Sequence, residues 1–126
     1  MLKLNSAKKF IDDIAMGEDL KILHGDFLDE FYRSNTKTQQ CMIDDEPRDF
    51  NNVDVLQYAN IAATVHKLAN DFKLNVPKWV FKSKYYLKEP YFPIEHWKLR
   101  AIYAFESPSE FKHRNIFVSA NTMSRV

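Results

Sequence analysis

Residues 53–72 read VDVLQYANIAATVHKLANDF, and this stretch decides the fold class of the chain. Its large apolar side chains alternate spacings of three and four residues: Tyr58, Ile61, Val65, Leu68 and Phe72. That spacing places them on one side of an α-helix. Smaller residues form a second apolar face, which lets a neighbouring segment approach closely. We therefore predict a helix over 53–72 near the centre of the protein, with Asn52 as its N-cap.

The sequence before this helix also has helical periodicity. Apolar residues fall on one side of segments 8–15 and 20–33, and Gly17 between them can take the left-handed conformation that ends a helix. We predict a loop at 34–38, a short helix at 39–45 and a polar connector up to residue 52. The single cysteine, Cys41, lies beside apolar Met42 and is predicted to be buried.

After residue 72, prolines and one capping signal divide the chain. Pro77 opens a short helix, residues 82–93 form an ordered loop, and residues 94–106 form a longer helix. The sequence SPSE at 107–110 matches a capping box with proline at the first helical position, so a further helix is expected there. Residues 116–118 fit either a helix or a short strand.

These elements predict an all-α fold. The chain has 126 residues, a length typical of one domain, and only two glycines, which disfavours a β fold with many tight turns. We predict a single compact domain of about six helices over residues 1–126. No apolar run approaches the roughly 20 residues that span a membrane. The first residues do not resemble a secretory signal, and a lone cysteine is typical of the cytoplasm, so we predict a cytoplasmic protein without a membrane partner.

Charge is distributed unevenly between the two halves. Residues 1–63 carry 7 basic and 12 acidic side chains, whereas residues 64–126 carry 11 basic and 5 acidic ones. Two interpretations are open: the halves attract each other, or the basic half binds an anionic partner. The formal net charge of +1 is small for a nucleic-acid-binding domain, which favours the first interpretation.

Residues 79–117 hold 11 of the 18 aromatic residues, interleaved with seven basic ones. Helix periodicity divides them. The residues predicted to anchor the core are Trp79, Trp97, Ile102, Phe105 and Phe111. The residues predicted to bind a protein partner lie in the proline-marked loop, and they are Tyr85, Tyr86, Tyr91, Lys82, Lys84 and Lys88. Aromatic side chains among lysines are typical of both protein interfaces and single-stranded nucleic-acid sites.

Two other functions stay open at this point. A nucleic-acid-binding module would add Arg100, Lys112 and Arg114 to the loop lysines, around exposed aromatic rings. A small enzyme would use His66, or His96 with Glu95, as titratable groups. Each of these three residues also has an ordinary structural explanation. The sequence contains no phosphate-binding loop, paired cysteines or nucleophile elbow, so we predict no metal or cofactor.

Several short motifs resemble those of a family of small uncharacterised bacterial proteins. They are NVPKW at 75–79, EPYFP at 89–93, LRAI at 99–102, ESP at 106–108 with Phe111, RNIFVSAN at 114–121, and SR at 124–125. FLDEF at 27–31 and DEP at 45–47 extend the likeness upstream. The resemblance implies a bacterial protein encoded beside a nucleotidyltransferase-like protein, in a pair similar to a toxin–antitoxin module. It supplies no site residues.

Together these observations give one leading hypothesis. The charge split, the aromatic-rich half and the missing catalytic motifs point to a non-enzymatic interaction protein, an antitoxin-like regulatory partner of another protein. The nucleic-acid-binding module and the small enzyme remain the alternatives.

Overall fold

In the computed structural model, which describes residues 5–124, the regular structure is helical. The α-helices are α1 (Ala7–Ala15), α2 (Leu20–Arg33), α3 (Thr36–Asp44), α4 (Val55–Asp71), α5 (Trp97–Glu106) and α6 (Ser109–Lys112), and two 3-10 helices, η1 (Lys78–Phe81) and η2 (Ser83–Tyr85), lie between α4 and α5. The remaining regular pairing within 5–124 is one isolated parallel bridge between Tyr91 and Ile116. The predicted all-α fold with six helices is confirmed.

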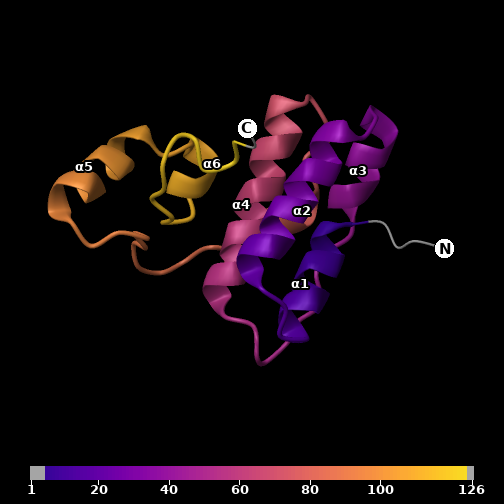
Figure 1. Cartoon of the computed structure of the whole chain (residues 1–126), viewed down its shortest axis with the longest axis horizontal. Helices are drawn as coiled ribbons and strands as arrows, with labels where there is room; N and C mark the ends of the chain where they lie inside the picture. The colour runs from indigo at the N-terminus through magenta and orange to yellow at the C-terminus, as the bar shows by residue number, and fades with distance from the viewer. Residues whose placement is uncertain (1–4, 125–126) are drawn as a thin grey trace.

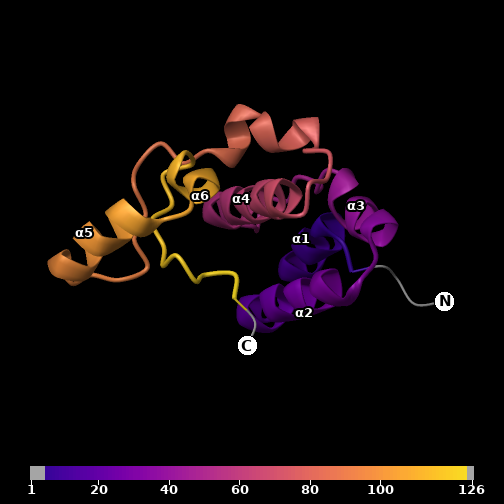
Figure 2. The same cartoon turned by 90° about the horizontal axis from the view of Figure 1, so that it is seen from above.

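Helix α4 lies at the centre, as predicted. Helices α1–α3 lie on one side of it, and η1, η2 and α6 cover the other (Figure 2). Its large apolar side chains Ile61, Val65 and Leu68 are fully buried, and so are the alanines of its smaller face. Because both faces are covered, the helix has little apolar surface left for any further element to pack against.

The start of α4 differs by a few residues from the prediction. Asp54 is the N-cap, and its carboxylate accepts a hydrogen bond from the backbone N–H of Leu56 at 2.9 Å. Asn52, the predicted cap, instead donates its side-chain amide to the carbonyl of Ala15 at 2.8 Å. Asn52 therefore ties the connector to the end of α1.

Helices α1–α3 follow the predicted pattern with two corrections. Gly17 ends α1 with φ +91°, as expected. Helix α3 begins inside the predicted loop, because the Asn35 side chain accepts from the N–H of Thr38 and caps it. Cys41 is exposed rather than buried, because the buried face of α3 carries Met42 and Ile43.

The acidic connector and the basic half meet directly. Glu46 accepts hydrogen bonds from Lys82 at 2.7 Å and from the Tyr85 hydroxyl at 2.8 Å, and Lys84 lies 2.6 Å from Asp49. The Trp79 indole N–H also donates to the carbonyl of Ile43. These contacts support the interpretation that the oppositely charged halves attract each other.

Helix α5 stands apart from this arrangement. The buried core takes side chains from every other helix, but α5 contributes none. Figure 1 shows α5 at the end of the molecule opposite α3, beyond α6 and away from the α1–α4 bundle. The chain therefore builds one core and one segment outside it.

Candidate protein-interaction surface

The apolar side chains of α5 face solvent. Trp97 is 70% exposed, Phe105 87% and Ile102 50%, so the prediction that these residues anchor the core is wrong. The same prediction is confirmed for Trp79 and Phe111, which are buried. The difference follows from position: Trp79 and Phe111 belong to elements that pack against α4, whereas α5 contributes no buried residue.

The outward face of α5 has a simple order. Trp97, Ala101 and Phe105 follow one another at four-residue spacing, which places them one turn apart in a stripe along the helix. All three are exposed, whereas Tyr103 on the opposite side is half-buried. Contiguous exposed apolar side chains of this kind mark interaction surfaces in soluble proteins. The sequence periodicity predicted this apolar stripe, but it predicted the stripe to be buried, and the side chains are exposed.

The segment that carries α5, residues 92–106, is here named the α5 lobe. Its beginning is held where the Tyr91 N–H donates to the carbonyl of Asn115 at 2.7 Å and the Phe117 N–H donates to the carbonyl of Tyr91 at 2.9 Å. The rings of Phe92 and Phe117 stack at 4.9 Å between centroids. The lobe therefore leaves the fold from a fixed point.

The end of the lobe is fixed to the same segment. The Ser107 hydroxyl accepts a hydrogen bond from the Val118 N–H at 2.8 Å and makes a further bond with the Tyr103 carbonyl. Ser107 is therefore not the predicted capping-box residue of α6, whose start has no side-chain cap. The predicted helix carrying Phe111 does form after Ser107, but its cap does not.

Two basic side chains of the nucleic-acid alternative, one inside the lobe and one in α6, donate hydrogen bonds to backbone carbonyls of the lobe. The Arg100 guanidinium donates to the carbonyl of Ile94 at 2.8 Å and lies over the Phe92 ring at 5.2 Å. Lys112 donates to the carbonyl of Phe105 at 3.1 Å. These contacts orient α5 and use part of the hydrogen-bonding capacity that a phosphate group would need.

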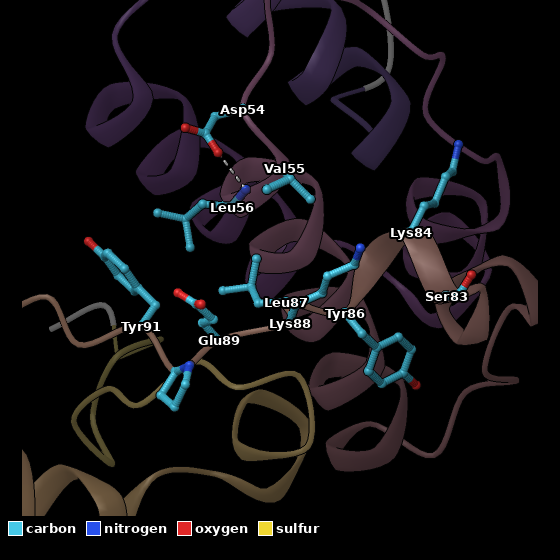
Figure 3. A pocket seen from close by; sticks show the side chains of 11 residues that line it. Asp54, Val55, Leu56, Ser83, Lys84, Tyr86, Leu87, Lys88, Glu89 and Tyr91 are labelled. Carbon is cyan, nitrogen blue, oxygen red and sulfur yellow. Dashed lines mark hydrogen bonds between the residues drawn. The ribbon is translucent and has the colours of Figure 1, made fainter.

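A groove of about 1060 Å³ lies between the start of α4 and residues 83–91. Figure 3 shows Val55, Leu56, Leu87 and Tyr91 around it, with the charged groups of Lys88 and other residues at its edge. Val55 is 53% exposed although it lies in the first turn of the central helix. The groove is a second apolar surface, and it contains part of the loop that the sequence predicted to bind a partner.

The tyrosines of that loop have different environments. Tyr85 is fully buried, and burial together with its hydrogen bond to Glu46 raises the pKa of its phenol far above the usual value. A partner cannot reach that ring, so the structure corrects the predicted role of Tyr85. The Tyr86 ring packs against Arg114 at 4.7 Å, and Tyr91 is 38% exposed at the groove.

The loop lysines are largely paired within the chain. Lys82 and Lys84 form ion pairs with Glu46, and Lys84 forms another with Asp49. Burial alone would raise the pKa of Glu46, but the hydrogen bonds from Lys82, Tyr85 and Lys84 outweigh it and lower that pKa. Lys88 lines the groove. Lys84 lines it too, but within residues 5–124 Lys88 is the one of the three lysines without an ion pair, so it is the one best placed for a partner.

Arg114 is the largest fully buried side chain among the described residues. Its guanidinium donates to the carbonyl of Val80 at 2.7 Å and to the carbonyl of Glu110 at 2.9 Å, while burial lowers its pKa. The predicted nucleic-acid contact at Arg114 is therefore wrong. The Val80 carbonyl, 34 residues upstream, and the nearby Glu110 carbonyl hold this cation inside the protein, where a phosphate group cannot approach it.

His66 accepts a hydrogen bond from Arg114. Its Nδ1 lies 3.2 Å from an Arg114 nitrogen, and because a guanidinium only donates, His66 Nδ1 must be the acceptor. Burial and the Arg114 charge lower the pKa of the imidazole. The ring also packs edge-on against Phe81 at 5.1 Å. These contacts support a structural role for His66.

The remaining enzyme candidates, Glu95 and His96, are exposed and precede α5. The groove is lined by neither of them and not by His66. Within residues 5–124, no group of three or more histidine, cysteine, aspartate or glutamate side chains is placed to hold a metal ion. Among residues 5–124, the groove therefore does not bring His66, Glu95 and His96 together.

Comparison with protein-family models, curated proteins and solved structures finds no match to this chain. No helix in the described part of the chain is long and apolar enough to cross a lipid bilayer. The surface that stands out on the geometry is the outward face of α5.

Proposed function

We propose that this protein is a non-enzymatic interaction protein whose α5 face binds another polypeptide chain. One observation carries the proposal: α5 is the one α-helix among residues 5–124 with no buried residue, and it exposes Trp97, Ile102 and Phe105. Burying such side chains at an interface is favourable by about 25 cal/mol per Å² of apolar surface. Tryptophan is also among the residues that contribute most to binding at protein interfaces.

The geometry of the lobe supports this proposal. The base of the lobe is tied at Tyr91 and at Ser107, so the helix is presented in a fixed orientation. A surface held in its binding conformation loses less conformational entropy when a partner docks. A helix that lays its apolar face into a groove of another protein is a common mode of recognition.

The finer part of the proposal comes from the resemblance to small bacterial proteins. We propose that the protein acts in the bacterial cytoplasm as an antitoxin-like regulatory partner. The nucleotidyltransferase-like protein that the resemblance implies is the partner to test first.

Site-specific photo-crosslinking in the bacterial host tests the proposal. A photoreactive phenylalanine analogue at Phe105 is expected to give a crosslinked protein adduct, identified by mass spectrometry. The matched control places the analogue at Ile22, which is 63% exposed on α2, far from the lobe. Equal adducts at both positions, or none at Phe105, would count against the proposed function.

A further inference from the structure

We infer that in the protein on its own the α5 face is covered by a second copy of this chain, in an antiparallel α5–α5 dimer. The inference rests on the proposed function, because it identifies the molecule that binds the same α5 face. Two properties of the helix support it: an apolar stripe that is complementary to itself, and charges placed to pair across a twofold axis.

The stripe is complementary to itself about its middle residue. Trp97 and Phe105 lie one turn before and one turn after Ala101. In a twofold antiparallel pair centred at Ala101, each Trp97 meets Phe105 of the second copy. A twofold interface uses the same patch on both subunits, as this arrangement does. The small Ala101 side chains face each other at the axis, where they let the two helices approach closely.

The charges beside the stripe favour the antiparallel direction. Lys98, Ile102 and Glu106 follow at four-residue spacing along one flank of the outward face. In the antiparallel pair this flank meets its own copy. With the axis at Ala101, Lys98 of one copy and Glu106 of the other are offset by two residues, about 3 Å along the helix, which their side chains can span, and the two Ile102 side chains have the same offset. A parallel pair would instead place this flank against the opposite flank of the second copy, which carries His96 and Arg100, so Lys98 would have no acidic partner there. Neither Lys98 nor Glu106 forms an ion pair within residues 5–124. Glu106 accepts a hydrogen bond from the Ala120 N–H at 3.2 Å, and the Lys98 ammonium lies 5.6 Å from the centroid of the Trp97 ring, at the edge of the stripe.

The position of α5 leaves room for such a pair. Both views of the molecule place α5 at one end, with the α1–α4 bundle at the other (Figures 1 and 2). The α1–α4 bundle therefore does not lie beside α5. Internal contacts of Arg100 hold the helix in this position, so the outward face is already formed before association.

The area of this surface sets the expected strength of the dimer. An aromatic side chain buries about 150–250 Å² when fully covered. Trp97, Phe105 and Ile102 of both copies together would bury on the order of 800 Å², below the roughly 1,200 Å² at which standard-size stable interfaces begin. We therefore expect a weak, reversible dimer whose population rises with protein concentration.

Sedimentation equilibrium of the full chain tests the inference. We expect the weight-average mass to rise from monomer toward dimer between about 5 and about 500 µM protein, as mass action requires. Phe105→Ser should leave the protein monomeric over this range, whereas the matched control Ile22→Ser should dimerise like the parent chain. Circular dichroism should show both variants folded, since both side chains are exposed.

A charge exchange tests the antiparallel direction. Lys98→Glu and Glu106→Lys should each weaken the dimer about tenfold, because each places like charges across the axis twice. The double variant exchanges both charges and should return the affinity to near that of the parent chain. If the single variants weaken the dimer and the double variant does not restore it, the antiparallel arrangement is wrong.

The outcomes separate this inference from the proposed function. A chain that stays monomeric at every concentration, while Phe105 still crosslinks to a different protein in the host, overturns the dimer and leaves the proposed function standing. A dimer that Phe105→Ser does not affect overturns the inference as well. If the dimer is overturned by either result and the photoreactive analogue at position 105 also gives no crosslinked adduct in the host, the proposed function is wrong as well.

Discussion

Helices α4 and α5 are both rich in apolar side chains, yet among the helices of residues 5–124 α4 has the most buried residues and α5 has none. Periodicity alone does not separate them, since each carries an apolar stripe at helical spacing. What differs is the surrounding chain. Helix α4 is enclosed from both sides, whereas α5 is carried away from the core on a segment fixed at its base. Burial is thus a property of the assembled fold, and α5 is left with a face that another chain can cover.

The largest expected difference in unfolding free energy is between alanine substitutions of a core phenylalanine and of a phenylalanine in the α5 lobe. Phe31, in α2, is fully buried and contacts the Phe72 ring at 5.2 Å between centroids, whereas Phe105 is 87% exposed. Phe31→Ala should lower the free energy of unfolding by about 3–5 kcal/mol through lost burial and a cavity. Phe105→Ala should change it by less than about 0.5 kcal/mol. Urea unfolding of the two variants at monomeric concentrations measures both values, and similar losses would contradict the division into core and lobe.

The next prediction concerns Arg114, whose buried guanidinium we expect to stabilise the folded protein. Arg114→Met leaves the carbonyl groups of Val80 and Glu110 without their donor, and we expect a loss of about 2–4 kcal/mol in unfolding free energy. Arg33→Met, at an exposed position on α2, is the matched control and should cost less than about 0.5 kcal/mol. Thermal and urea unfolding give the comparison. An unchanged stability for Arg114→Met would mean that water satisfies these carbonyl groups.

The two halves of the chain meet at Tyr85. Removing its hydroxyl should lower the free energy of unfolding by less than the Arg114 substitution does. Tyr85→Phe removes the hydrogen bond to Glu46 while keeping the buried ring, and should cost about 1–2 kcal/mol. Tyr91→Phe at the exposed groove should be close to neutral. Equal effects of the two substitutions in urea unfolding would show that the Glu46 contact adds nothing to the joining of the halves.

The smallest expected effect is a pH dependence from His66. Its pKa is lowered in the folded state, so the unfolded chain binds the proton more readily than the folded one. The stabilising contribution is complete above the unfolded pKa of about 6.5 and is lost as pH falls through the lower folded value. His66→Gln keeps an acceptor for Arg114 without titrating, and should flatten that part of the pH profile. A profile identical to the parent chain between pH 7 and 5 would show that His66 does not couple to folding.

The sequence predicted the central helix because its apolar spacing extends over about four turns and needs no partner to be recognised. It misplaced Trp97 and Phe105 because periodicity shows that a helix has an apolar face but not what covers that face. Arg114 was misassigned for a related reason. The Val80 carbonyl that accepts its hydrogen bond lies 34 residues upstream. No local sequence pattern predicts a contact over that separation. Ser107 matched a capping box, but its hydroxyl bonds to the backbone of Val118 and does not cap α6.

The common base of the α5 lobe has a consequence for how this protein can change. Tyr91 and Ser107 are both tied to residues 115–118, so the chain returns close to the point where it left. Loop-closure entropy grows only slowly with length, and such exposed excursions tolerate insertion and exchange. A different helix could therefore be grafted in place of residues 93–106, which would change the surface that the lobe exposes while the bundle keeps its sequence.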